Sequence, residues 1–222
     1  MTRADFLPAG CNADALAAVD RWHDWPDRRL LLCGPRGCGR THLGRIWAAD
    51  TQAPVLNGAR LDSLPEPAPA YLVDDAHCVA GVAAREEALF HLYNRAEADA
   101  APLMLTAPDT PGTWGVALPD LSSRLQTFAV TRLAAPDDEL LYMVLIKLFD
   151  DRQLSVSPET VKFLTRRIDR SLRNAVQVVQ ALDHAALTLQ KRISRAMAAD
   201  VLAGLAPDTS SGADDVRDSD AT

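Results

Sequence analysis

The feature that most constrains the fold is a glycine-rich loop that starts at Gly34. An apolar run, Leu30-Leu31-Leu32-Cys33, leads into it, and apolar residues at helical spacing resume at Leu43. The order is strand, loop, helix, which is the context that a phosphate-binding P-loop requires. Glycines let such a loop curl so that its N–H groups point inward, and the following helix adds the positive end of its dipole. The loop therefore predicts a nucleotide site.

One position departs from the P-loop pattern GxxxxGK[ST], because Arg40 stands where lysine is required, whereas Thr41 supplies the hydroxyl for Mg²⁺. A guanidinium is wider than an ammonium, planar and always charged. We expect Arg40 to hold a diphosphate without supporting efficient hydrolysis by this chain. A glycine-rich turn that binds no nucleotide is the competing interpretation. The loop residues expected to contact the nucleotide are Gly34, Pro35, Arg36, Gly37, Cys38, Gly39, Arg40, Thr41 and His42.

A second motif lies downstream, where Tyr71-Leu72-Val73 leads into Asp74 and Asp75. Apolar residues followed by two carboxylates have the form of a Walker B strand. Asp74 would orient a water on Mg²⁺, and Asp75 would position the attacking water as a base. A strand that ends in two capping aspartates has the same pattern, but the independent P-loop upstream favours the nucleotide site. Thr106, at the end of another apolar run, is expected near the γ-phosphate or the catalytic water.

Composition narrows the class of protein. The chain has 222 residues, 48% hydrophobic and 24% charged, which allows one ordinary domain and a small one. We see no membrane-spanning run or secretory signal, and the four cysteines and five histidines lack ligand spacing. A cytoplasmic protein without membrane contact is therefore expected. The net charge of −7 disfavours direct sequence-specific DNA binding, since such surfaces are usually basic.

Strands and helices alternate up to Pro136, and only helices follow. The alternation predicts an α/β fold in which a parallel sheet has helices on both faces. We expect the last helix to close at Gly204. The strands expected after the P-loop strand are 54–57, 71–75, 102–106 and 127–130.

We therefore divide the chain into three parts. Residues 1–135 form the α/β nucleotide-binding domain, and residues 136–205 form a small all-helical domain. Residues 206–222 form an acidic tail that we expect to be disordered.

These stretches together resemble a known family. A P-loop α/β domain followed by a small helical lid is the AAA+ arrangement, and the details resemble the DnaA branch and, within it, the Hda (HdaA) family of short DnaA-related regulators. The resemblance spans residues 5–204, and its segments SSRL and KLF…DR are narrower signals than the P-loop alone. The matching stretches are 5–7, 11–12, 19–22, 24–26, 34–42, 118–125, 136–138, 147–149, 151–152 and 167–174.

The resemblance implies regulatory inactivation of the replication initiator. Members of the Hda family bind ADP, associate with the DNA polymerase sliding clamp and stimulate ATP hydrolysis by DnaA. The arginine finger that acts in trans corresponds to Arg124, and the sensor 2 arginine of the lid, which touches bound nucleotide, corresponds to Arg173. A solvated helix-end cation and an ordinary ion pair in the lid are the other interpretations. ADP or ATP, with Mg²⁺, is the expected cofactor.

Several features bear on which function to expect. A helix-turn-helix domain is not seen after the lid, and the proline-rich connection at 61–69 leaves little room for the helices with which DnaA handles single-stranded DNA. We therefore expect a regulator rather than an initiator. The QLxLxL peptide with which the Hda family binds the clamp is not visible before Asp5, so the sequence does not decide whether this chain binds the clamp. It does not decide the oligomeric state either. A self-hydrolysing AAA+ ATPase such as a helicase loader, and an adaptor that binds no nucleotide, remain alternatives.

Overall fold

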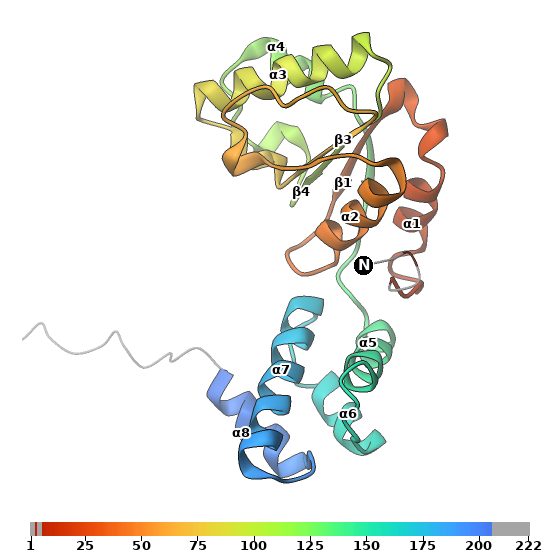
Figure 1. Cartoon of the computed structure of the whole chain (residues 1–222), viewed down its shortest axis with the longest axis vertical. Helices are drawn as coiled ribbons and strands as arrows, with labels where there is room; N and C mark the ends of the chain where they lie inside the picture. The colour runs from red at the N-terminus through yellow and green to blue at the C-terminus, as the bar shows by residue number, and fades with distance from the viewer. Residues whose placement is uncertain (1–2, 4–5, 206–222) are drawn as a thin grey trace, which may run out of the picture.

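The computed structural model describes Arg3 and residues 6–205, which form a sheet domain and a helical domain placed end to end (Figure 1). The tail predicted at 206–222 lies outside the described residues. The strands are β1 (Arg29–Cys33), β2 (Val55–Asn57), β3 (Tyr71–Asp74), β4 (Leu103–Ala107) and β5 (Ala129–Arg132). The α-helices are α1 (Ala13–Asp20), α2 (Arg40–Thr51), α3 (Ala83–Ala98), α4 (Pro119–Leu125), α5 (Asp138–Asp150), α6 (Pro158–Thr165), α7 (Leu172–Leu189) and α8 (Arg195–Leu205). Short 3-10 helices span Trp22–Asp24, Pro26–Arg28, Gly58–Arg60, Ala76–Val79 and Pro111–Thr113.

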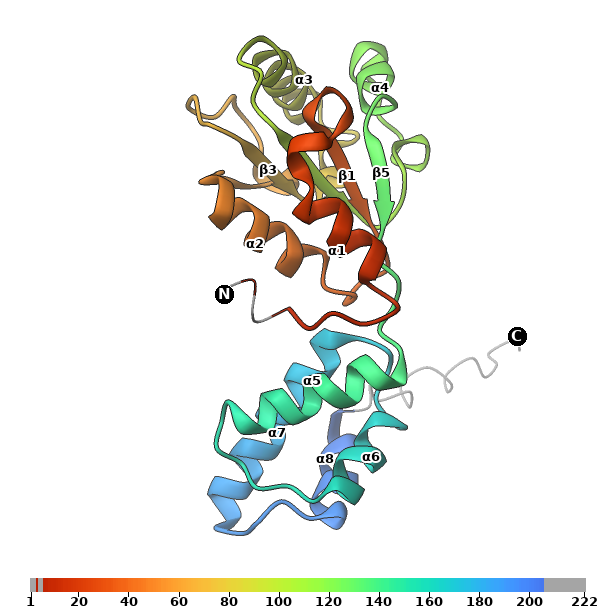
Figure 2. The same cartoon turned by 90° about the vertical axis from the view of Figure 1, so that its right-hand side faces the viewer.

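The strands form one five-stranded sheet in the order β2-β3-β4-β1-β5, with every neighbouring pair parallel. β1 is flanked on both sides, because Leu31 is opposite Leu105 of β4 and Val130 of β5. Parallel strands bring all their carboxyl ends to one edge of the sheet. Figure 2 shows β5 pointing toward the helical domain, so the carboxyl edge faces that domain.

Alternate side chains of the strands enter two separate cores, one on each face of the sheet. Leu31 and Leu105 pack with α3 and α4, whereas Leu32 and Met104 pack with α1 and α2. Burial on both faces explains why these strands are continuous apolar runs rather than alternating ones. The predicted parallel sheet with helices on both faces is confirmed.

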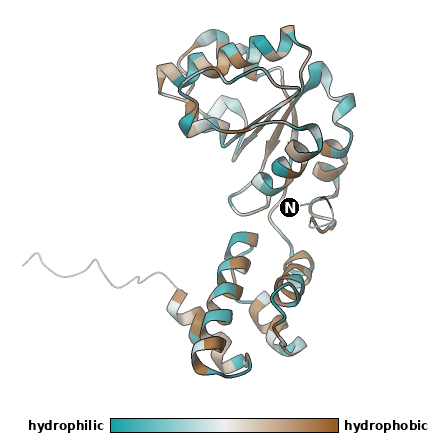
Figure 3. Cartoon of the chain, viewed as in Figure 1, coloured by the Kyte–Doolittle hydropathy of each residue, from teal (hydrophilic) through white to brown (hydrophobic). Residues whose placement is uncertain are grey.

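The helical domain has a core of its own, in which Leu145, Val179 and Met197 belong to one buried cluster. Each of its helices carries both apolar and polar residues, as Figure 3 shows by colour. Helices α6 and α7 begin directly after Ser157 and Ser171, whose side chains accept hydrogen bonds from backbone N–H groups of the first turn. No helix of the described residues is long and apolar enough to cross a membrane.

Each predicted strand after β1 differs from the observed one by one or two residues at one or both ends, and the last helix also ends at a different residue. β5 begins at Ala129 rather than at Thr127, because the N–H and hydroxyl of Thr127 both donate to the carbonyl of Arg124 and close α4. α8 continues to Leu205, so the expectation that Gly204 closes this helix was wrong. Gly204 does not have the positive φ that a glycine cap adopts.

A buried carboxylate ties α3 to the segment that leads into α4. The Glu86 oxygens accept hydrogen bonds of 2.7–3.1 Å from the N–H groups of Gly81, Ala117 and Leu118. Burial alone would raise the pKa of Glu86, but these three donors favour the charged form and hold the pKa below its ordinary value of 4.5. The charged carboxylate therefore fixes the entry to α4.

We predict that Glu86→Gln lowers the free energy of unfolding by about 1–3 kcal/mol at pH 7, because an amide cannot accept all these bonds and leaves a buried N–H unpaired. Since the folded-state pKa of Glu86 is depressed, its contribution is present above about pH 4.5 and is lost as the pH falls through the folded pKa. Chemical denaturation at pH 7 and at pH 3.5–4 measures the difference. Glu87→Gln, at the exposed neighbouring position, is the control. A difference that stays constant with pH would contradict the role of the charge.

Candidate functional site

The P-loop joins β1 to α2 at the carboxyl edge of the sheet. β1 ends at Cys33 and α2 begins at Arg40, which confirms the expected order of strand, loop and helix. Gly37 and Gly39 have φ values of 81° and 108°, in the region that favours glycine. α2 is 12 residues long, and its amino end opens on the loop. Its free N–H groups and dipole favour an anion there.

Three oxygen-bearing side chains meet beside the loop. The hydroxyls of Thr41 and Thr106 donate to the same oxygen of Asp74, at 3.1 and 2.6 Å. The register explains the meeting, because Val73 and Leu105, the preceding residues of β3 and β4, lie opposite each other. Asp74 and Thr106 are both buried. Hydroxyl and carboxylate oxygens are the ligands that Mg²⁺ prefers, so Thr41 and Asp74 fit a nucleotide-bound Mg²⁺.

Arg40, which replaces the P-loop lysine, lies between the loop and the end of β3. Its Nη2 is 3.6 Å from Oδ1 of Asp75, and its side chain is only 10% exposed. Its Nη1 is buried and has no hydrogen-bond partner among the described residues. A buried donor without an acceptor costs about 1–3 kcal/mol, and a phosphate oxygen in the P-loop would remove that cost. The orphaned donor therefore fits a bound anion.

Asp75 is held by its backbone at the end of β3. Its φ of 51° lies in the left-handed region, and its N–H donates to the hydroxyl of Thr106 at 3.0 Å. Its carboxylate is 42% exposed and faces Arg40. The two residues on which hydrolysis at this site would depend are thus paired with each other.

The helical domain reaches the P-loop through the first turn of α7. The N–H of Leu172 donates to the carbonyl of Gly37 at 2.8 Å. A Cβ at Gly37 would lie 2.1 Å from Oγ of Ser171, so a glycine is needed for this approach. Arg173 is exposed on the same turn and has no hydrogen bond or ion pair within the described part of the chain. The structure therefore brings Arg173 near the loop without showing a contact.

The remaining loop residues differ in environment. Pro35 and Arg36 are exposed, and Cys38 is buried, which raises the pKa of its thiol. The ring of His42 makes an edge contact with Phe6, with centroids 5.5 Å apart. Phe6 therefore joins the segment before α1 to the start of α2.

Arg124 lies at the opposite edge of the sheet. Its guanidinium carbon is 5.2 Å from the centroid of the Tyr93 ring, and that of Arg29 is 5.0 Å from the same centroid. Arg29 is the first residue of β1, whereas Gly34 follows its last residue. Five steps along a strand span about 16 Å. Arg124 is thus separated from its own P-loop by the length of β1, and it forms an exposed ion pair of 3.6 Å with Glu97.

Sequence reasoning gave no functional role to Arg29, Tyr93 or Glu97. A charged residue at the first position of a central strand was the available signal for Arg29, which is 2% exposed. Its Nη1 donates to the carbonyl of Ala101 at 3.0 Å. The contact between Arg29 and Tyr93 joins distant segments, so no local pattern predicts it.

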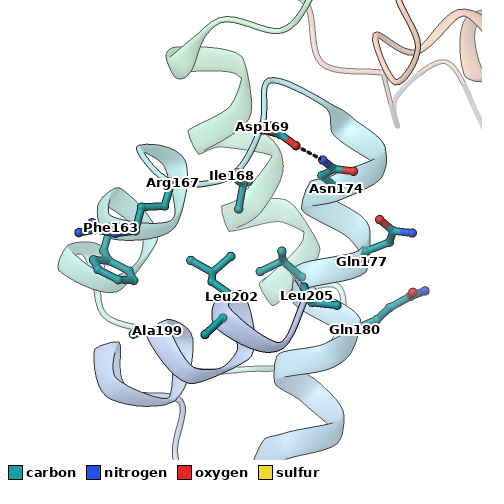
Figure 4. Close-up of a pocket in the computed structure, with 12 residues that line it drawn as sticks. Phe163, Arg167, Ile168, Asp169, Asn174, Gln177, Gln180, Ala199, Leu202 and Leu205 are labelled. Carbon is teal, nitrogen blue, oxygen red and sulfur yellow. Dashed lines mark hydrogen bonds between the residues drawn. The ribbon is translucent and has the colours of Figure 1, made fainter. Parts of the chain in front are cut away.

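A groove of about 850 Å³ lies in the helical domain between α6, α7 and α8 (Figure 4). The guanidinium carbons of Arg167 and Arg195 lie 4.1 and 4.9 Å from the centroid of the Phe163 ring at this groove. Asn174 donates to Asp169 at its rim. None of the residues predicted to bind nucleotide lines it.

The sheet domain, its P-loop and the helical domain together have the AAA+ fold. Domain III of DnaA from Thermotoga maritima matches with a TM-score of 0.79 and 19% identity, over 93% of this chain and 97% of that one. AMPPCP-bound DnaA from Aquifex aeolicus matches with a TM-score of 0.64 and 16% identity, over 79% of this chain and 62% of that one. The RuvB Holliday junction branch migration motor of Thermotoga maritima matches with a TM-score of 0.66 and 19% identity, over 92% of this chain and 72% of that one.

The helical domain has a match of its own, to a model of a protein family. Residues 138–202 match the family model for the lid domain of Hda. The chain therefore has the fold of DnaA domain III, and its helical domain is similar to the lid domain of Hda.

We predict that Gly37→Ala weakens binding of ADP about 10-fold or more, because a side chain is strained at positive φ and meets Ser171. Titration of the intact protein with a fluorescent ADP analogue measures this. Gly115→Ala is the control, since Gly115 has a similar φ of 75° but nothing within 4 Å of an added Cβ. Equal affinities of the Gly37→Ala variant and the wild-type protein would contradict a nucleotide site at this loop.

Proposed function

We propose that this protein is a negative regulator of chromosomal replication initiation, which binds a nucleotide and stimulates ATP hydrolysis by DnaA. The observation that carries this proposal is the position of Arg124, whose side chain is 44% exposed at the edge of the sheet opposite its own P-loop. An arginine there cannot reach phosphates bound by the same chain, but it can reach those of a second protein docked on that edge. The Hda-type lid supports DnaA as the second protein.

Arg124 would act as an arginine finger in trans. Phosphoryl transfer develops charge on the oxygens of the transferred group, and a guanidinium stabilises that charge, contributing roughly 10³–10⁵-fold in rate in other systems. The Arg124 side chain makes a ring contact and one long ion pair, but no hydrogen bond to another described residue. Its N–H donors are therefore available to a phosphate of the partner.

The protein's own site would bind ADP or ATP, with Mg²⁺ held through Thr41 and Asp74. Thr106 and Arg173 would contact the phosphates from the sheet and the lid. Because Arg40 replaces lysine and pairs with Asp75, we propose that the nucleotide stays bound as a ligand and is hydrolysed only slowly. The hydrogen bond from Leu172 to Gly37 links the occupied loop to the lid.

Partners follow from the same proposal. DnaA is the first, and the DNA polymerase sliding clamp is the second, as in the Hda family, although its binding segment in this chain is unassigned. We propose no sequence-specific contact with DNA and leave a homo-oligomer open. The proposed units are the nucleotide-binding domain at 1–135 and the lid at 136–205, in a cytoplasmic protein.

Two other functions make different predictions. A self-hydrolysing AAA+ ATPase such as a helicase loader would turn over ATP alone and respond to single-stranded DNA. An adaptor without nucleotide would give a flat titration with ADP and ATP. Measuring turnover and nucleotide affinity of the isolated protein separates both from the proposed regulator, which binds nucleotide but hydrolyses it slowly.

We predict that Arg124→Ala reduces stimulation of DnaA-bound ATP hydrolysis by at least about 10³-fold, or to the basal rate where stimulation is smaller. Folding and ADP affinity should stay nearly unchanged, because a half-exposed side chain contributes little to the core. Single-turnover hydrolysis of DnaA-bound ATP measures the effect, with and without clamp loaded on DNA.

Arg85→Ala is the matched control, because Arg85 is also a surface arginine paired with a carboxylate, Asp62, at 2.9 Å. This variant should stimulate as the wild type does. Full stimulation by the Arg124→Ala variant would contradict the assignment of Arg124 as the arginine finger. Acceleration without clamp would show a clamp-independent regulator.

A further inference from the structure

The ring of Tyr93 is a fixed platform beside Arg124. Tyr93 is 4% exposed on α3, and its ring packs against Phe128 with centroids 6.1 Å apart. The buried guanidinium of Arg29 also lies over this ring, at 5.0 Å. Arg29 is itself anchored by hydrogen bonds to the carbonyls of Arg28 and Ala101. The ring therefore has little freedom to move.

The hydroxyl of Tyr93 reaches the backbone of Arg124 through Thr127. Oγ1 of Thr127 donates to the carbonyl of Arg124 at 2.8 Å and lies 3.4 Å from the Tyr93 hydroxyl. A threonine hydroxyl has a single proton, so the Tyr93 hydroxyl is the donor in the second contact. The N–H of Thr127 donates to the same carbonyl at 3.1 Å. Tyr93 is thus linked to both ends of Arg124, to the backbone indirectly through Thr127 and to the guanidinium by its ring.

Contact through the ring face suits a side chain that must bind something else. A cation over an aromatic ring is attracted by the ring quadrupole, and this contact uses none of the N–H donors. The competing carboxylate, Glu97, is 3.6 Å away and its side chain is 52% exposed, so this ion pair is weak. A partner's phosphate could displace Glu97 without breaking the ring contact.

We infer that Tyr93 is a positioning residue for Arg124, which sets the direction of the guanidinium before DnaA binds. The inference rests on the proposed function and adds a residue that acts through Arg124 rather than on the phosphate. It also explains why a charged residue begins β1, because Arg29 fixes the platform from within the sheet domain.

The test compares two variants of the intact protein, one that removes both the ring and the hydroxyl and one that removes the hydroxyl alone. Tyr93→Leu removes both, and we expect the maximal rate of hydrolysis of DnaA-bound ATP to fall about 10-fold. The concentration of this protein that gives half-maximal stimulation should change less than about 2-fold, because docking is unaffected. Tyr93→Phe keeps the ring and should stay within about 3-fold of the wild-type rate. Tyr93→Leu added to Arg124→Ala should have no further effect.

Phe90→Leu is the matched control, since Phe90 is a partly buried aromatic residue on the same helix. A second measurement needs no variant to fold. In the wild-type protein, the Arg124 side-chain protons should show an upfield ring-current shift by NMR that exposed Arg132 lacks. The Tyr93→Phe variant should retain that shift.

The outcomes separate the two proposals. Loss of maximal rate in Tyr93→Leu, with the half-maximal concentration and the Phe90→Leu control unchanged, supports the positioning role. Wild-type stimulation by Tyr93→Leu when Arg124→Ala is inactive, or no ring-current shift in the wild-type protein, overturns the positioning role and leaves the proposed function standing. No stimulation by the wild-type protein overturns both.

Discussion

The direction of β1 is the constraint on which both candidate sites depend. Its carboxyl end releases the P-loop at Gly34, and its amino end carries Arg29, which supports Tyr93 and, through that ring, Arg124. β1 is held in this direction by parallel pairing with β4 on one side and β5 on the other. The P-loop and Arg124, the proposed finger, are therefore kept apart by the length of one strand.

Two buried carboxylates, those of Asp74 and Glu86, join neighbouring elements of the sheet domain by hydrogen bonds. Asp74 accepts hydrogen bonds from Thr41 of α2 and Thr106 of β4, so it joins three elements at the carboxyl edge. Glu86 joins α3 to the segment at 117–118 that leads into α4. In both cases N–H or O–H donors bond to the buried carboxylate oxygens, which offsets the cost of removing them from water. These contacts fix loops that apolar packing alone would leave free.

Much of this arrangement follows from local sequence. The strands, the capping serines and the P-loop are local patterns, and the meeting of Thr106 with Asp74 follows once the strands are known to be parallel. Contacts between distant segments could not be predicted. The approach of Ser171 to Gly37 depends on how the lid sits on the sheet domain, and the contacts of Tyr93 with Arg29 and Arg124 depend on how α3 packs. The start of β5 was misplaced for a local reason, because Thr127 closes α4 by donating to the carbonyl of Arg124.

The two arginines of the proposed mechanism differ in a way that suits different tasks. Arg40 is 10% exposed, is paired with Asp75 and has a buried donor without a partner among the described residues, so its environment fits a bound anion. Arg124 is 44% exposed and is held through a ring face, so its donors can engage a phosphate and release it. In the proposed mechanism the nucleotide is retained at the carboxyl edge of the sheet, where the N–H of Leu172 donates to the carbonyl of Gly37, while Arg124 acts at the opposite edge. Slow hydrolysis at one edge would therefore support repeated action at the other.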